Sequence, residues 1–120
     1  MKKENRNTLT ELFNNTRYLN EYINLNDTLK NNEIDNIDEF IEVVQERINE
    51  AEVIYYSEAM KLLNVHDTSL TISLSLASDF GYNTIDLNSE LLATLLIQQI
   101  LSEELSELIE EIEKQNIFND

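Results

Sequence analysis

Pairs of glutamates three positions apart are the residues of this chain whose type and spacing best suit chemistry. Glu39 and Glu42 form one pair, and Glu104 and Glu107 form another. This spacing places both carboxylates of a pair on one face of a helix. His66 is the sole histidine and cysteine is absent, so zinc sites and most general-base arrangements lack ligands.

The two pairs resemble the Glu-x-x-Glu motifs of all-α nucleotide pyrophosphatases, which hold magnesium. Neither pair is followed by a Glu-x-x-Asp pair at the expected distance, and no basic cluster is present for a triphosphate. One glycine, Gly81, cannot build a phosphate-binding loop. A magnesium-dependent pyrophosphatase is therefore a minor alternative, and we expect a non-enzymatic protein with no catalytic residue, cofactor or metal.

Helices are the elements predicted to position these residues. The 120 residues include no proline and one glycine, so tight turns between strands lack their usual residues. We predict an all-α fold of about five helices in a compact bundle, with a long acidic C-terminal helix. Residues 1–120 are expected to form a single helical domain, with residues 1–6 as a flexible tail.

Apolar spacing predicts the first helix over residues 8–24, with Thr8 and Glu11 as a capping box. The Asn-rich residues 24–36 are expected to form a connector. Asn36 is then predicted to cap a second helix, with Glu39 at its third position. The expected inner positions of this helix are Ile37, Phe40, Ile41, Val44 and Ile48.

A third helix is predicted over residues 53–64 after a bend near residues 50–52. Its expected inner positions are Ile54, Tyr55, Ala59, Leu62 and Leu63. A fourth helix is expected to begin at Asp67 or Thr68 and to end at Gly81. Asn88 is predicted to cap the last helix, which runs to about Gln115.

Acidic side chains dominate the chain beyond its first 32 residues. The net charge of −16 repels nucleic acid and anionic membranes and attracts basic surfaces. Six glutamates fall within residues 103–113, where like-charged neighbours and the helix dipole both oppose them. They form either a solvated face that maintains solubility or a docking surface for a basic partner. The candidate partner-binding residues are Glu103, Glu104, Glu107, Glu110, Glu111, Asp38, Glu42 and Glu46.

An apolar stripe follows the same segment. Leu101, Leu105, Leu108 and Ile112 are spaced like a heptad repeat. Core packing within one chain is the favoured use, because the stripe covers less than two heptads; a homodimer through the last helix is the alternative. The apolar run over residues 91–101 is too short for a bilayer, and the first residues are not expected to form a secretory signal. With cysteine absent, a cytoplasmic protein of a bacterial host is expected.

Between Ile54 and Leu96 the sequence resembles a group of small uncharacterised acidic helical domains of bacterial phages and plasmids. The matching positions are Tyr55-Tyr56, Ala59-Met60, His66-Asp67, Ser69-Leu70, Gly81-Tyr82 and residues 87–93. The N-terminal third lies outside this resemblance, which implies no particular activity.

The chain is small, acidic and free of cysteine, and in this composition it is similar to many anti-CRISPR inhibitors of mobile elements. This similarity implies an inhibitor from a mobile element that binds a basic nucleic-acid-handling protein, such as a CRISPR effector nuclease, with an RNA-targeting effector among the candidates. No direct contact with nucleic acid is expected. The alternative is a small acidic structural or adaptor module.

Overall fold

The computed structural model describes residues 2–31, 34–65 and 88–118. Over these residues the chain forms six helices and no strand, which confirms the all-α prediction. The chain divides into two compact units. Unit 1 consists of residues 1–50 and 101–120, and unit 2 of residues 51–100. The predicted fourth helix, with His66 and Gly81, lies outside the described residues.

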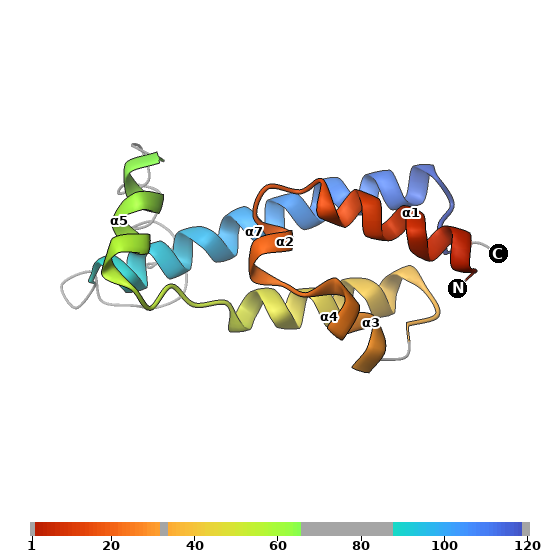
Figure 1. The fold of residues 1–120 in the computed structure, drawn as a ribbon, viewed down its shortest axis with the longest axis horizontal. Helices are drawn as coiled ribbons and strands as arrows, with labels where there is room; N and C mark the ends of the chain where they lie inside the picture. Colours follow the sequence, from red (N-terminus) through yellow and green to blue (C-terminus); the bar gives the residue numbers. More distant parts are fainter. Residues whose placement is uncertain (1, 32–33, 66–87, 119–120) are drawn as a thin grey trace. The chain divides into compact units, whose positions relative to one another are not determined.

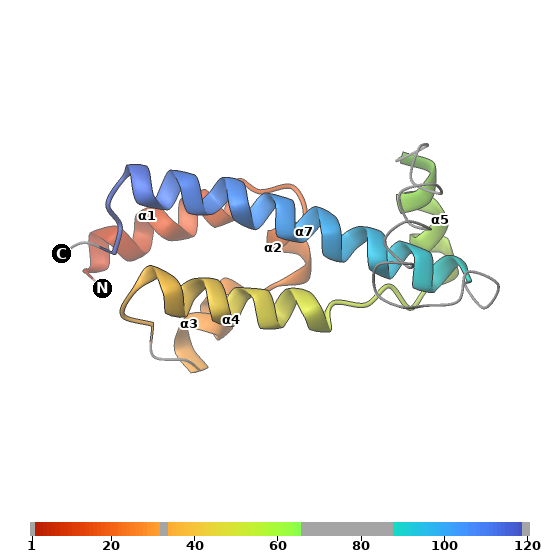
Figure 2. The ribbon, with the colours of Figure 1, turned by 180° about the vertical axis from the view of Figure 1, so that it is seen from behind.

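Unit 1 contains four helices and the second half of a fifth. They are α1 (Lys3–Asn14), α2 (Leu19–Tyr22), α3 (Leu25–Asn31), α4 (Ile37–Glu50) and the part of α7 (Ser89–Lys114) that follows Ile100. In unit 1, α1 and α4 both run in the direction opposite to α7 (Figure 1). The view from behind shows α1 alongside the second half of α7 (Figure 2).

The first helix differs from its prediction at both ends. It begins at Lys3, so residues 3–6 are helical where a tail was expected, and it ends at Asn14. Thr8 lies inside the helix, where its hydroxyl donates to the Glu4 carbonyl at 3.0 Å, so the predicted capping box with Glu11 is wrong. Residues 8–24 therefore do not form one helix.

A polar network separates α1 from α2 without proline or glycine. The Thr16 hydroxyl donates to the Phe13 carbonyl at 2.7 Å and accepts from the Asn20 backbone N–H at 3.2 Å. The Asn20 side-chain amide donates to the Asn14 carbonyl at 2.8 Å. Side-chain donors thus satisfy two backbone carbonyls at the end of α1, and a side-chain oxygen accepts from a backbone N–H of α2.

The predicted connector over residues 24–36 contains α3. The Asn24 side-chain oxygen accepts from the Asp27 N–H at 3.1 Å, which is the geometry of a helix N-cap. Leu25 and Thr28 are buried. The segment is therefore part of the core of unit 1 and not only a linker.

Local capping was predicted correctly for α4. The Asn36 side-chain oxygen accepts from the Glu39 N–H at 2.9 Å, and the Glu39 carboxylate accepts from the Asp35 N–H at 2.9 Å. Of the expected inner positions, Phe40, Val44 and Ile48 are fully buried, whereas Ile37 and Ile41 are half-buried.

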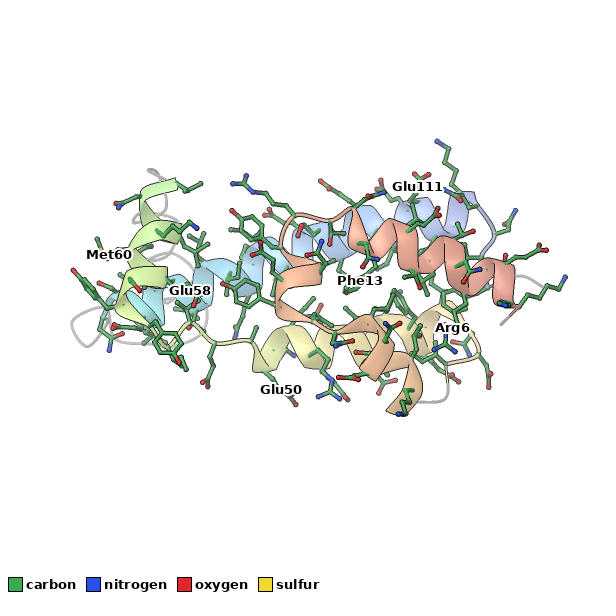
Figure 3. The ribbon with its side chains drawn as sticks, viewed as in Figure 1. Arg6, Phe13, Glu50, Glu58, Met60 and Glu111 are labelled. Carbon is green, nitrogen blue, oxygen red and sulfur yellow. The ribbon has the colours of Figure 1, made fainter. Side chains whose placement is uncertain are left out.

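The core of unit 1 forms where α1, α4 and the second half of α7 meet. Phe13 points between α1 and α4 (Figure 3) and is 1% exposed. Burying side chains of this size contributes about 1.5–3 kcal/mol each. The other large side chains of this core are Leu9, Leu19, Phe40, Val44, Ile48, Leu101, Leu105, Ile112 and Ile117.

The end of α7 brings further side chains into this core. Asn116 has φ of 53°, the left-handed conformation of a helix C′ residue. The Ile117 N–H donates to the Ile112 carbonyl at 3.3 Å and the Asn116 N–H to the Glu113 carbonyl at 3.2 Å, the two bonds of a Schellman motif. The chain turns there, burying Ile117 and placing the Phe118 ring 5.7 Å from Phe40.

Unit 2 contains α5 (Tyr56–Val65) and the first half of α7. Asn88 caps α7 as predicted, since its side-chain oxygen accepts from the Leu91 N–H at 2.8 Å. Ala59 and Leu62 are buried, as expected for the inner face of α5. The described core residues of unit 2 also include Val53, Ala93, Leu95, Leu96 and Ile97.

Candidate functional site

The second half of α7 has an apolar and an acidic face. Leu101, Leu105, Leu108 and Ile112 are all buried, so the heptad-like stripe packs within the chain, as favoured from the sequence. A homodimer through this stripe would require unit 1 to open. On the opposite face Glu103, Glu107 and Glu110 are exposed, and we name these three residues the α7 acidic ridge.

Glu104, a predicted partner-binding residue, uses its carboxylate inside unit 1. Its oxygens accept from the backbone N–H groups of Arg17 at 3.1 Å, of Tyr18 at 2.8 and 3.1 Å, and of Leu19 at 3.0 Å. These N–H groups lie at the N-terminus of α2, where the first turn has no backbone acceptor and a negative charge is favourable. Glu104 therefore attaches α2 to α7.

Glu111 lies on the flank of α7 next to Glu104 in the helical projection. It is half-buried, and its carboxylate accepts from the Gln115 side-chain amide at 2.9 Å. Figure 3 labels Glu111 on the α7 side of unit 1. Its position leaves it at the edge of the α7 acidic ridge.

The remaining predicted residues lie on α4. Asp38, Glu42 and Glu46 are exposed and spaced four residues apart, on the face opposite Phe40 and Val44. We name them the α4 acidic ridge. Both helices turn their apolar faces to the same core, so the two ridges point away from it in different directions. Apart from Glu104, the structure thus places the predicted residues on two surfaces rather than one.

In each Glu-x-x-Glu pair, one of the two glutamates has a structural role. Glu39 belongs to the cap of α4, and Glu104 holds the start of α2. Within the described part of the chain, no group of three or more His, Cys, Asp or Glu is arranged to hold a metal ion. The carboxylates that remain outward in these pairs are Glu42 and Glu107, one in each ridge.

Sequence reasoning missed a cleft of about 420 Å³ in unit 1. Phe13, Ile23 and Leu25 contribute its buried apolar lining. Its polar lining comes from Asn14, Asn20, Asn24 and Asn26 with Thr10, Glu21 and Tyr22. The density of asparagine over residues 14–26 was the available signal. Residues up to 24 were instead assigned to the first helix, and the following residues to a connector.

A second surface that the sequence did not predict lies in unit 2. Ile54 and Tyr55, expected on the inside, are 64% and 66% exposed, and Tyr56 is 63% exposed. The expectation is wrong because α5 begins only at Tyr56 and Val53 takes the inner position, at 2% exposed. The assumed helical register therefore does not apply to residues 53–55.

Comparison with known proteins identifies no relative of this chain. No protein-family model, no curated protein and no solved structure matches the chain. The resemblance to acidic helical domains of phages and plasmids stays a prediction. In the described ranges, none of the helices has the length and apolar character needed to cross a membrane.

Proposed function

We propose that this chain is a non-enzymatic inhibitor that binds a basic, nucleic-acid-handling protein through the α7 acidic ridge. The supporting observation is that Glu107 and Glu110 are exposed on the face opposite the core, while the neighbouring Glu104 is taken up by the fold. An exposed carboxylate is accessible to a partner. On α7, the Glu104 carboxylate thus stabilises the fold, whereas the Glu107 and Glu110 carboxylates point outward.

The ridge is unfavourable for the isolated helix. Like charges three or four residues apart cost roughly 0.2–0.5 kcal/mol per pair. The helix dipole adds roughly 0.3–1 kcal/mol at low salt for each anion in the last turn, where Glu111 and Glu113 lie next to the ridge. Lys114 is the basic residue in the last turn of α7. A basic partner would relieve both terms at once, which is the physical argument for docking.

The partner class that we favour is an RNA-guided nuclease of a bacterial host, which would make the chain an anti-CRISPR protein of a mobile element. Such nucleases hold their guide duplex in a positively charged channel. An acidic helix fits that electrostatic environment, and the net charge of −16 would accelerate association with it.

The proposal is tested by pull-down of the tagged chain from lysates that express a panel of CRISPR effectors with their guides, washed at low and high salt. The informative variant is Glu107→Lys with Glu110→Lys, which leaves Glu104 and the core intact. The matched control is Glu4→Lys with Glu11→Lys, the same change of charge at exposed positions of α1.

We expect a stoichiometric effector band that weakens with salt, disappears in the α7 variant and persists in the α1 control. Equal loss of effector binding in both variants would show that the electrostatic field of the whole chain, and not the α7 acidic ridge, attracts the partner. Binding that neither variant reduces would contradict the proposed surface. A panel without any bound effector would contradict the anti-CRISPR function.

A further inference from the structure

The segment that precedes α5 is held to α7 by side-chain hydrogen bonds. The Val53 N–H donates to the Thr94 hydroxyl oxygen at 2.8 Å, and the Gln98 side-chain amide donates to the Ala51 carbonyl at 3.0 Å. The Val53 side chain is buried beneath the segment. Residues 51–53 thus have a defined conformation although they belong to no helix.

This attachment presents three large apolar side chains to solvent. Ile54, Tyr55 and Tyr56 follow the buried Val53 directly, and each is more than 60% exposed. The Tyr55 carbonyl accepts from the Ala59 N–H at 2.9 Å, so the first turn of α5 fixes the backbone on the other side. Hydrogen bonds therefore fix the backbone on both sides of the two tyrosines.

The surrounding charge indicates what these rings can bind. Glu52 is exposed two residues before Ile54, and Glu58, labelled in Figure 3, is half-buried in the first turn of α5. Tyrosine faces attract cations, and a guanidinium can stack on a ring while it pairs with a carboxylate. The chain shows this stacking itself in unit 1, where the Arg17 guanidinium carbon lies 4.9 Å from the centre of the Tyr18 ring.

We infer that Ile54, Tyr55 and Tyr56 form a contact surface for arginine side chains of a basic protein partner. An arginine provides the planar cation for the rings and an aliphatic stem for Ile54. A second copy of the chain is the less favourable occupant, because it would bring Glu52 and Glu58 against their equivalents. The inference rests on the proposed function, which supplies the basic partner. It adds that arginine is the side chain of the partner that this chain recognises.

The test compares oligo-arginine and oligo-lysine peptides of equal length, with affinities for the full chain measured by fluorescence anisotropy at fixed salt. Charge alone attracts both peptides equally, whereas stacking on two rings favours arginine by roughly tenfold. Tyr55→Ala with Tyr56→Ala should bring this ratio close to one. Tyr55→Phe with Tyr56→Phe keeps the rings and should keep the ratio.

An equal affinity for both peptides in the unmodified chain would overturn the inference. So would a preference that survives removal of the rings, no binding of either peptide, or a dimer in sedimentation equilibrium that the alanine variant dissociates. Both sites are exposed, so circular dichroism should show the same helix content in all variants. If both peptides bind equally and Glu107→Lys with Glu110→Lys abolishes binding, the arginine contact fails while the α7 docking surface stands.

Discussion

Glu104 connects two parts of unit 1 that are far apart in sequence. Its carboxylate accepts three consecutive backbone N–H groups, those of residues 17–19. We expect Glu104→Ala to lower the free energy of unfolding by about 2 kcal/mol, because N–H groups lose a charged acceptor at a helix N-terminus. Urea denaturation followed by circular dichroism measures the change.

Glu107→Ala is the matched control for that measurement, since it removes a glutamate three residues further along the same helix. Its side chain is exposed, so the free energy of unfolding should change by no more than about 0.5 kcal/mol. Equal effects of the two substitutions would show that the contacts of Glu104 contribute nothing specific.

The Thr94 hydroxyl is the acceptor that holds Val53 in unit 2. Thr94→Val keeps the shape of the side chain but leaves the Val53 N–H without this acceptor, at a cost of about 1–3 kcal/mol where the group stays buried. Faster hydrogen exchange of the Val53 amide is the expected result, measured by NMR. Thr94→Ser retains the hydroxyl and should restore slow exchange; fast exchange in both variants would point to packing instead.

Single residues also show what the sequence could predict. Asn36 and Asn88 cap their helices as predicted, because an N-cap depends on residues within one turn of it. Glu104 was grouped with its neighbours as a surface carboxylate, because the backbone N–H groups that donate to it lie 85 to 87 positions away in the chain. No local pattern distinguishes it from Glu103 or Glu107.

At the scale of elements, the acidic ridge of α7 should reduce stability. We expect Glu107→Gln with Glu110→Gln to raise the free energy of unfolding by about 0.5–1 kcal/mol at low salt, because repulsion from the glutamates three or four residues away is removed. Thermal unfolding at low ionic strength measures this gain. It should disappear at about 1 M salt, where the Debye length is near 3 Å; a gain independent of salt would have a non-electrostatic cause.

The turn that ends α7 depends on the left-handed conformation of Asn116. Asn116→Gly should stabilise unit 1 slightly, by up to about 1 kcal/mol, since glycine adopts this conformation without steric cost. Asn116→Ala should destabilise it, because alanine lacks the local hydrogen bonding of asparagine. Chemical denaturation of both variants tests the order Gly, Asn, Ala, and a reversed order would contradict the role of the turn.

Helix existence was predicted better than helix boundaries. The absence of proline and near-absence of glycine favoured helices throughout, but it also hid the break between α1 and α2. That break depends on Thr16, Asn20 and the distant Glu104, none of which is a standard helix terminator. The exposed Tyr55 was likewise missed, because its position follows from the bond between Val53 and Thr94.

For the whole molecule, the excess of carboxylates predicts a strong dependence of stability on ionic strength. With a net charge of −16, self-repulsion destabilises the compact state. Raising NaCl from about 10 mM to about 300 mM should raise the midpoint of thermal unfolding by roughly 4 °C or more. Circular dichroism at a fixed wavelength follows the transition.

Magnesium chloride at the same ionic strength is the control for that titration. Screening alone predicts a similar rise for both salts at equal ionic strength. A rise that is already complete at micromolar magnesium, where screening is negligible, would indicate a specific cation site. That result would favour the nucleotide pyrophosphatase alternative and contradict the interpretation of the Glu-x-x-Glu pairs as helix-stabilising and outward-facing residues.

α7 is synthesised after the helices of unit 1 that it covers, and this has a consequence for the nascent chain. Unit 1 is made of residues from both sides of unit 2, so Leu9, Phe13 and Phe40 emerge from the ribosome long before Leu101, Leu105 and Ile112. At about 5–20 residues per second, the intervening stretch takes roughly 3–10 s to translate. During that interval the first helices have no α7 to cover them, and they are the part of the chain that a chaperone would bind.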